Sequence, residues 1–157
     1  MQIYVAGKWE DRHRCRRVMD RLEAAGHTIT CDWTNHNYPP AGSEYMLTYY
    51  SMCDIQGVRD CDLLVCIASK SLPYRGLFVE LGVALAMGHR VAIIGHGIDT
   101  CIFVQHPLVK HYNRLGRLIK DLESPSIRPS YPLGTRRIGS DGTPQVYVRM
   151  NKVKEIS

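Results

Sequence analysis

The strongest constraint in this sequence is its alternation of short apolar runs with segments of helical periodicity. The runs QIYVA (2–6), DLLVCIA (62–68) and RVAIIG (90–95) are almost wholly apolar, and HTITCDW (27–33) favours β-structure. Strands that are apolar on both sides belong in parallel sheets whose two faces are covered by helices. The pattern therefore predicts an α/β fold, a three-layer doubly wound parallel sheet of four to five strands.

Helices are predicted between these strands from apolar spacing and from start and stop residues. Between residues 11 and 26, four apolar side chains recur at helical intervals before Gly26 ends the pattern. The remaining predicted elements are a helix from Ser43 to about Arg59, a helix at 77–88, a weak strand at 109–112 and a helix at about 115–122.

At 157 residues, the chain is long enough for one domain with its own core. We predict a domain over 1–123, followed by a basic tail over 124–157 that is rich in Pro, Ser and Gly. Within the tail, QVYVRM (145–150) predicts one added strand.

Composition favours a soluble protein of a reducing compartment. The chain is 45% hydrophobic and 22% charged, has no run of about 18 apolar residues, and turns charged soon after its first strand. Six cysteines without a CxxC pair favour a reducing cytoplasm over a disulfide or zinc framework. We therefore expect a cytoplasmic location and no membrane partner.

Several ligand classes lack their sequence signatures. The chain has no GxGxxG or Walker loop, so no Rossmann or P-loop cofactor is expected. Its histidines show neither HExxH nor paired Cys/His spacing, so no metal site is expected. The net charge of +5 suits phosphate-bearing ligands, although a solvated helix face and a basic tail are the simpler explanation. The basic stretches lack interleaved aromatic residues, so nucleic acid is not expected as a partner.

Glu80 is the only ionisable residue between Leu77 and Met87. A helix that is apolar on every side is buried, so this carboxylate loses its hydration unless it lines a cavity. We predict that its helix opens at about Gly76, which places Glu80 in the first turn and at the edge of the sheet where ligands bind. The alternative is a structural acid stabilised by the helix dipole, but the Ser or Thr of a capping box is absent.

Three segments carry a resemblance to a known family: IYVAGKW (3–9), CDIQGVRDCDLLV (53–65) and GLFVELGVALAMGHRV (76–91). In this order they resemble the nucleoside 2-deoxyribosyltransferase family and its relatives that hydrolyse nucleoside 5'-monophosphates. The similarity covers about residues 1–108, and the segment around Glu80 is its most specific part. The resemblance implies a flavodoxin-like sheet, which agrees with the alternation of strands and helices.

The resemblance also implies roles for individual residues. Glu80 matches the nucleophile that attacks the sugar C1' and releases the base, leaving a glutamyl-sugar ester. Tyr4 matches the tyrosine that orients this carboxylate, Asp54 the acid that contacts the sugar hydroxyls, and Trp9 a residue near the base. Without the resemblance, these three residues are a core aromatic, an exposed helix charge and an exposed loop aromatic. The other predicted substrate-binding residues are Gly7, Ser71, Arg75 and Gly76.

One departure from the family pattern bears on the substrate. Base-exchanging members carry an acid about six residues before the nucleophile, whereas this chain has Tyr74 there with Arg75 beside it. Monophosphate-hydrolysing relatives place a small hydroxyl residue at that position to hold phosphate. Arg75 with Lys70, Ser69 and Ser71 forms a candidate phosphate site near the helix start, and the alternative is a solvated loop.

The resemblance implies a homodimer or a higher homo-oligomer, because family pockets are completed across subunits. Base-exchanging members lend an Asn from a neighbouring subunit, and GIDTCIFVQHP (97–107) has none. The residue that completes the pocket therefore stays open.

The expected activity is cleavage of the N-glycosidic bond of a 2'-deoxyribonucleoside, with transfer of deoxyribose to another base and water as a weaker acceptor. The expected partners are a small-molecule nucleoside or nucleotide and a free base. One alternative is hydrolysis of 2'-deoxyribonucleoside 5'-monophosphates. Another is a nucleotide-binding module without chemistry.

Overall fold

The computed structural model describes residues 1–36, 43–69, 74–98, 101–124, 137–138 and 144–145. The chain forms two compact units, Met1–Ser124 and Pro125–Ser157. All of the predicted site residues belong to the first unit.

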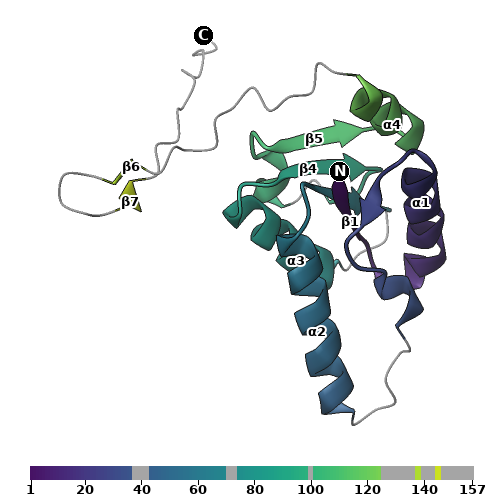
Figure 1. Ribbon diagram of the computed structural model, residues 1–157, viewed down its shortest axis with the longest axis vertical. Helices are drawn as coiled ribbons and strands as arrows, with labels where there is room; N and C mark the ends of the chain where they lie inside the picture. The colour runs from purple at the N-terminus through teal and green to yellow at the C-terminus, as the bar shows by residue number, and fades with distance from the viewer. Residues whose placement is uncertain (37–42, 70–73, 99–100, 125–136, 139–143, 146–157) are drawn as a thin grey trace. The chain divides into compact units, whose positions relative to one another are not determined.

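The first unit is built on a five-stranded parallel sheet. Its strands are β1 (Gln2–Ala6), β2 (Thr28–Ile29), β3 (Leu63–Ile67), β4 (Arg90–Ile94) and β5 (Val109–Tyr112). They pair in the order β2-β1-β3-β4-β5, and every pairing is parallel (Figure 1). This arrangement confirms the predicted flavodoxin-like, doubly wound sheet.

Helices cover both faces of this sheet. The α-helices are α1 (Arg12–Ala24), α2 (Glu44–Arg59), α3 (Arg75–Ala86) and α4 (Leu115–Glu123), and short 3₁₀ turns are η1 (Trp9–Asp11), η2 (Trp33–Asn35) and η3 (Ile102–Gln105). Figure 1 shows α1 and α4 on one side of the sheet and α2 and α3 on the other. Two helical layers therefore enclose the apolar strands, as the sequence predicts.

Helix α1 shows how sequence periodicity becomes packing. Its four apolar side chains at helical spacing all lie buried against the sheet, while its charged residues face outward. Gly26 follows the helix with a φ of 84°, a left-handed conformation that glycine adopts without steric cost. The buried stripe consists of Cys15, Val18, Met19 and Leu22.

The second strand is shorter than the sequence predicts. Residues 27–33 were expected to form it, but β2 ends at Ile29. Beyond it, the Asp32 side chain accepts a hydrogen bond from the Thr34 backbone N–H at 3.1 Å and begins η2. The Trp33 indole N–H donates to the Val5 carbonyl at 2.6 Å, so this apolar residue is buried through its side chain rather than as part of a strand.

Helix α3 begins at Arg75 rather than at the predicted opening at about Gly76, and Glu80 lies in its second turn rather than its first. Tyr74 is the N-cap residue and is buried, and its hydroxyl donates to the Ser69 carbonyl at 2.6 Å. This anchor draws the helix start back toward the end of β3. The helix dipole acts mainly on the first turn, so it is a weaker influence on Glu80 than the sequence suggested.

The second unit contains one described pair of short strands. β6 (Arg137–Ile138) pairs antiparallel with β7 (Pro144–Gln145), with Arg137 opposite Gln145. The strand predicted at 145–150 therefore includes Gln145, and residues 146–150 lie outside the described residues. The division of the chain at residue 123 stays a prediction.

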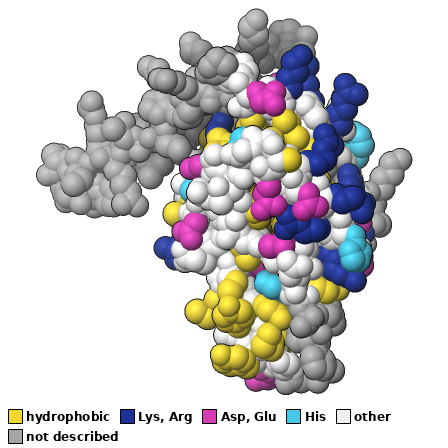
Figure 2. Space-filling view, turned by 45° about the vertical axis from the view of Figure 1, so that its right-hand side comes forward, with side chains coloured by type: hydrophobic (Ala, Val, Ile, Leu, Met, Phe, Trp, Pro, Cys, Tyr) yellow, Lys and Arg dark blue, Asp and Glu magenta, His cyan; other side chains and the backbone are white. Residues whose placement is uncertain are grey.

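The N-terminal half of α2 carries an exposed apolar face. Tyr45 and Met52 are 80% and 66% exposed, and Tyr49, on the same face of the helix, is also exposed. Figure 2 shows hydrophobic side chains gathered at the lower end of the molecule, where α2 begins in Figure 1.

In the described part of the chain, no helix is long and apolar enough to span a bilayer.

Gly57 allows α2 to approach the sheet closely. A Cβ at this position would lie 2.6 Å from the Cys31 Cβ and 2.9 Å from the Tyr4 ring. Neither contact is the free end of a flexible side chain, so a larger residue forces the helix outward.

We expect Gly57→Ala to destabilise the fold by about 1 to 3 kcal/mol, because overpacking outweighs the better helix propensity of alanine. Gly82→Ala in α3 is the matched control, since a Cβ there meets nothing within 4 Å. The control is expected to stabilise by about 0.5 to 1 kcal/mol. Urea unfolding measures both changes, and equal stabilisation by the two variants would contradict this account of Gly57.

Candidate active site

The central feature of the site is a hydrogen bond between β1 and α3. The Tyr4 hydroxyl donates to Glu80 Oε1 at 2.7 Å, joining residues 76 positions apart in the sequence. Tyr4 is fully buried, and Glu80 is only 9% exposed. The sheet register and the packing of α3 therefore bring together the two residues that the resemblance pairs.

Burial changes the acid strength of Glu80. Loss of hydration raises the pKa of its carboxyl from 4.5 to about 8, the Tyr4 hydrogen bond acts in the opposite direction, and the nearby charge of Asp54 raises it further. Among the described residues, Glu80 Oε2 has no hydrogen-bond partner. One carboxylate oxygen is thus held by the protein, while the other is buried without a described hydrogen-bond partner.

Asp54 lies on α2, one helical turn before Gly57, on the side of the helix that approaches Tyr4. Burial raises the pKa of its carboxyl, while the His36 charge and the hydrogen bond from Cys31 act in the opposite direction. The Cys31 thiol donates to Asp54 Oδ1 at 3.8 Å. Asp54 is therefore part of the same buried polar region as Tyr4 and Glu80, rather than an exposed helix charge.

Gly7 and Trp9 lie on the loop after β1. A Cβ at Gly7 would lie 2.4 Å from Cys15 Sγ, so this glycine allows α1 to pack against the end of β1. The ring centre of Trp9 is 6.5 Å from that of Trp33, and the Arg12 guanidinium lies 4.9 Å from the Trp9 ring. Packing is sufficient to explain Gly7, and contact of either residue with a substrate stays a prediction.

Arg75 and Gly76 occupy the first turn of α3 and are exposed. A Cβ at Gly76 would meet nothing within 4 Å, so there is open space beside the helix start. Lys70 and Ser71 lie outside the described residues. The structure therefore brings an exposed guanidinium to a helix N-terminus, and the rest of the predicted phosphate site stays a prediction.

Hydrogen bonds between Tyr74 and Ser69 join the start of α3 to the residues that follow β3. The Tyr74 hydroxyl contacts the Ser69 backbone N–H and lies 2.8 Å from the Ser69 hydroxyl. The Ser69 hydroxyl donates to Asp11 Oδ2 at 3.0 Å. The Tyr74 hydroxyl is therefore engaged by Ser69 in this structure.

A separate cavity of about 490 Å³ lies at the β5 edge of the sheet. It is lined by residues 110–114 together with Arg117 and Asp121, and contains none of the predicted site residues. Lys110 pairs with Asp121 at 2.8 Å, and Arg117 lies 3.8 Å from the same carboxylate. These contacts partly neutralise the basic lining, so we assign no ligand to this cavity.

Sequence reasoning missed three residues of the buried polar region. Gly57 lies within a recognised motif, but only the packed structure shows what its missing side chain permits. Cys31 and His36 belong to the segment predicted as a strand and loop, and they meet Asp54 from another element. No short spacing connects these residues in the sequence.

The fold and the buried Glu80–Tyr4 pair define a flavodoxin-like α/β protein with a carboxylate positioned by a phenol. The family described as nucleoside 2-deoxyribosyltransferase matches residues 3–136. The chain therefore belongs to the nucleoside 2-deoxyribosyltransferase family. No curated protein matches it.

Solved structures share the fold at low sequence identity. The CMP N-glycosidase BcmB of Clostridium botulinum is 18% identical, with a TM-score of 0.52 over 78% of this chain and 98% of that chain. The 2-deoxyribosyltransferase of Bacillus psychrosaccharolyticus is 16% identical, with a TM-score of 0.61 over 76% and 90%. A conserved protein of Enterococcus faecalis V583 is 15% identical, with a TM-score of 0.55 over 78% and 96%. These similarities concern the fold.

The raised pKa of Glu80 predicts a pH-dependent stability. The unfolded chain releases this proton near pH 4.5, whereas the folded chain retains it up to about pH 8. Between these values the folded state binds more protons, so the contribution of Glu80 to stability falls as the pH rises and levels off above about pH 8.

We expect Glu80→Gln to remove this slope, which is on the order of 1 kcal/mol per pH unit. Urea unfolding at intervals from pH 5 to about 8.5 measures the change. Glu44→Gln, at an exposed position in the first turn of α2, is the matched control and should retain the wild-type slope. A wild-type slope in Glu80→Gln would show that the carboxyl ionises normally in the folded protein.

Proposed function

We propose that this protein cleaves the N-glycosidic bond of 2'-deoxyribonucleosides and transfers the deoxyribose to another base. The observation that carries the proposal is the buried Glu80 carboxylate, held at Oε1 by Tyr4 while Oε2 has no described partner. Family membership supports the same chemistry. A hydrogen-bonded structural acid has no need of a free buried oxygen, whereas a nucleophile does.

In the proposed reaction, Glu80 Oε2 attacks the sugar C1' as its ionised carboxylate. The bond from C1' to the base nitrogen breaks, its electron pair leaves with the base, and a glutamyl-sugar ester forms. The negative carboxylate stabilises the oxocarbenium-like transition state before it bonds to C1'. The departing base takes up a proton from solvent. A second base then attacks C1' and releases its N–H proton to solvent, the ester bond breaks and the Glu80 carboxylate is restored. Water at this step gives hydrolysis instead.

Tyr4 and Asp54 serve this step in different ways. Tyr4 positions Glu80 by its hydrogen bond and favours the ionised carboxylate, opposing the effect of burial on its pKa. Asp54 is proposed to accept a hydrogen bond from a sugar hydroxyl. Its partial burial within the same polar region supports this role.

A second candidate substrate is a 2'-deoxyribonucleoside 5'-monophosphate, hydrolysed at the same bond. The favouring observation is Arg75, exposed at the start of α3 beside Tyr74. A guanidinium next to a helix N-terminus suits a phosphate group. The fold is also similar to that of a CMP N-glycosidase.

We also propose a homo-oligomer of at least two chains. The exposed apolar face of α2, which includes Tyr45 and Met52, supports association because such a face gains by burial against a second copy. Light scattering at the assay concentration measures the assembly. An active monomer would contradict this proposal.

We expect Glu80→Gln to lower the rate of base release by at least about 1,000-fold, because the covalent nucleophile is lost. Tyr4→Phe should lower the rate less, since it removes orientation alone. Base release from a panel of deoxynucleosides, with and without free bases, is the measurement, and Glu44→Gln is the control. Near wild-type release by a folded Glu80→Gln protein would disprove the catalytic role. Ligand binding by the wild type without release of any base would favour the non-catalytic module.

Arg75→Ala separates the two candidate substrates. If Arg75 binds a 5'-phosphate, its loss should raise KM for a deoxynucleoside monophosphate by about 10- to 100-fold and leave unphosphorylated nucleosides unchanged. Arg17→Ala, at an exposed position on α1, is the matched charge control. Equal small effects on both substrates would rule out the phosphate site and favour transfer between nucleosides and bases.

A further inference from the structure

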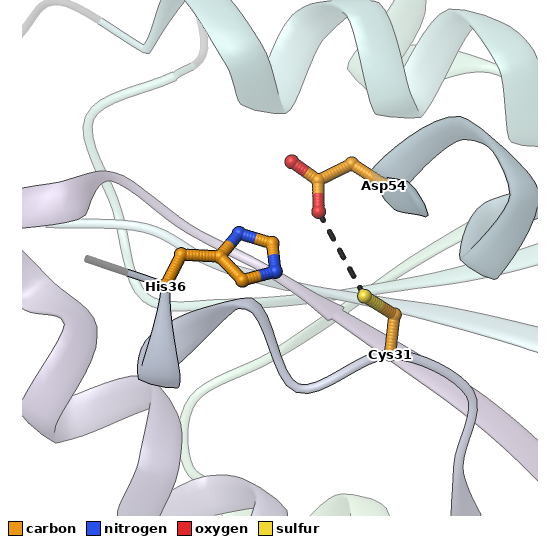
Figure 3. A group of neighbouring side chains, drawn as sticks. All are labelled: Cys31, His36 and Asp54. Carbon is orange, nitrogen blue, oxygen red and sulfur yellow. Dashed lines mark hydrogen bonds between the residues drawn. The ribbon is translucent and has the colours of Figure 1, made fainter. Parts of the chain in front are cut away.

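Three side chains with metal-binding atoms meet beside the candidate active site. Cys31 follows β2, His36 ends η2 and Asp54 lies on α2. The Cys31 sulfur, an imidazole nitrogen of His36 and a carboxylate oxygen of Asp54 all lie within 4.8 Å of one another. Figure 3 shows the His36 ring and the Asp54 carboxylate both directed toward the Cys31 sulfur. Within the described residues, this is the one group of three or more such side chains.

The surrounding packing holds each of the three side chains in place. The His36 ring stacks on the Tyr50 ring, with centroids 4.0 Å apart and an interplanar angle of 11°. Tyr50 lies one helical turn before Asp54, so α2 supports the imidazole and supplies the carboxylate. The close approach of Gly57 to the Cys31 Cβ fixes the third ligand against the same helix.

The distances are near those of a zinc site. Zinc bonds of about 2.0 to 2.3 Å in a tetrahedron place neighbouring ligand atoms about 3.6 Å apart. The Cys31 sulfur and Asp54 Oδ1 are already 3.8 Å apart. All three side chains are partly buried, and no pair of their ligand atoms is more than 4.8 Å apart. One thiolate and one carboxylate also balance the charge of a divalent cation.

A nucleophilic role for Cys31 is a poorer explanation of the cluster. A reactive cysteine needs a lowered thiol pKa. Burial, with the charges of Asp54 and other acidic neighbours, raises the pKa of the Cys31 thiol to about 12. These surroundings disfavour a free thiolate and therefore a nucleophilic role for Cys31.

We propose that Cys31, His36 and Asp54 bind one Zn²⁺ ion, with the fourth coordination position open to water. Binding releases the thiol proton to solvent and involves no change of oxidation state. Because Asp54 is proposed to contact the sugar, the bound ion competes with the nucleoside. The zinc site is inferred from the three side chains alone, whereas the competition with the nucleoside rests on the proposed function.

Binding is tested with the full-length protein, freed of metal by a chelator and titrated with Co²⁺ and then Zn²⁺. We expect one Co²⁺ per chain, a thiolate-to-cobalt absorption band, and displacement of the cobalt by Zn²⁺. Loss of a residue that only supports a metal ligand typically weakens metal binding by about 10- to 100-fold. Cys31→Ser and His36→Gln each remove a ligand, so each should weaken metal binding by more than this.

Two variants outside the cluster are matched controls: Cys101→Ser, also partly buried, and His13→Ala, exposed on α1. Both should bind as the wild type does. Thermal melts confirm the fold of each variant, and His36→Gln suffices if Cys31→Ser does not fold. Absence of stoichiometric binding, or equal binding by wild type, Cys31→Ser and His36→Gln, would overturn the site.

To test competition, the rate of base release is measured as a function of nucleoside concentration at several fixed Zn²⁺ concentrations. The same protein in the presence of chelator is the zinc-free reference. We expect Zn²⁺ to raise KM in the wild type, and His36→Gln to require at least about 10-fold more Zn²⁺ for the same effect. Full activity of zinc-saturated wild type would overturn the competition. Cobalt binding without any base release would leave the zinc site standing and contradict the proposed function.

Discussion

The hydrogen bond between Tyr4 and Glu80 is the interaction on which the site depends. It places a carboxyl group in an apolar interior, where its charged form loses most of its hydration. A partner on β1, an interior strand of the sheet, holds the group there at a fixed position. The same burial that makes the carboxyl costly to ionise raises its pKa and leaves its second oxygen without a described partner.

Close helix packing extends this pair into a larger polar region. Gly57 allows α2 to lie against the Tyr4 ring and the Cys31 side chain, and Asp54 is one turn away on the same helix. The acid therefore influences Glu80 through charge. Stability and chemistry are coupled at this contact, because any side chain at position 57 that moves the helix also moves the carboxylate.

Asp54 has two proposed roles, one in binding the sugar and one in binding a metal ion. Toward Tyr4 and Glu80 it belongs to the glycosidic site, and toward Cys31 and His36 it belongs to a set of metal ligands. A single carboxylate cannot serve a sugar hydroxyl and a zinc ion equally well, since the cation withdraws its electron density. Binding of zinc to Asp54 therefore opposes binding of the sugar, and this one side chain connects the proposed metal site to the proposed substrate site.

The sequence by itself determined the sheet, most element boundaries and the lone acid in an apolar helix, because apolar periodicity reports which faces are buried. The sequence pattern overestimated the length of β2 and placed Glu80 in the first turn of α3 rather than the second. The reason is that Asp32, Trp33 and Tyr74 form side-chain hydrogen bonds, which apolar periodicity does not report. Its family resemblance paired Tyr4 with Glu80. The meeting of Cys31, His36 and Asp54 was decided by tertiary structure alone, since it depends on how closely two elements pack, and that distance is set by contacts far apart in the chain.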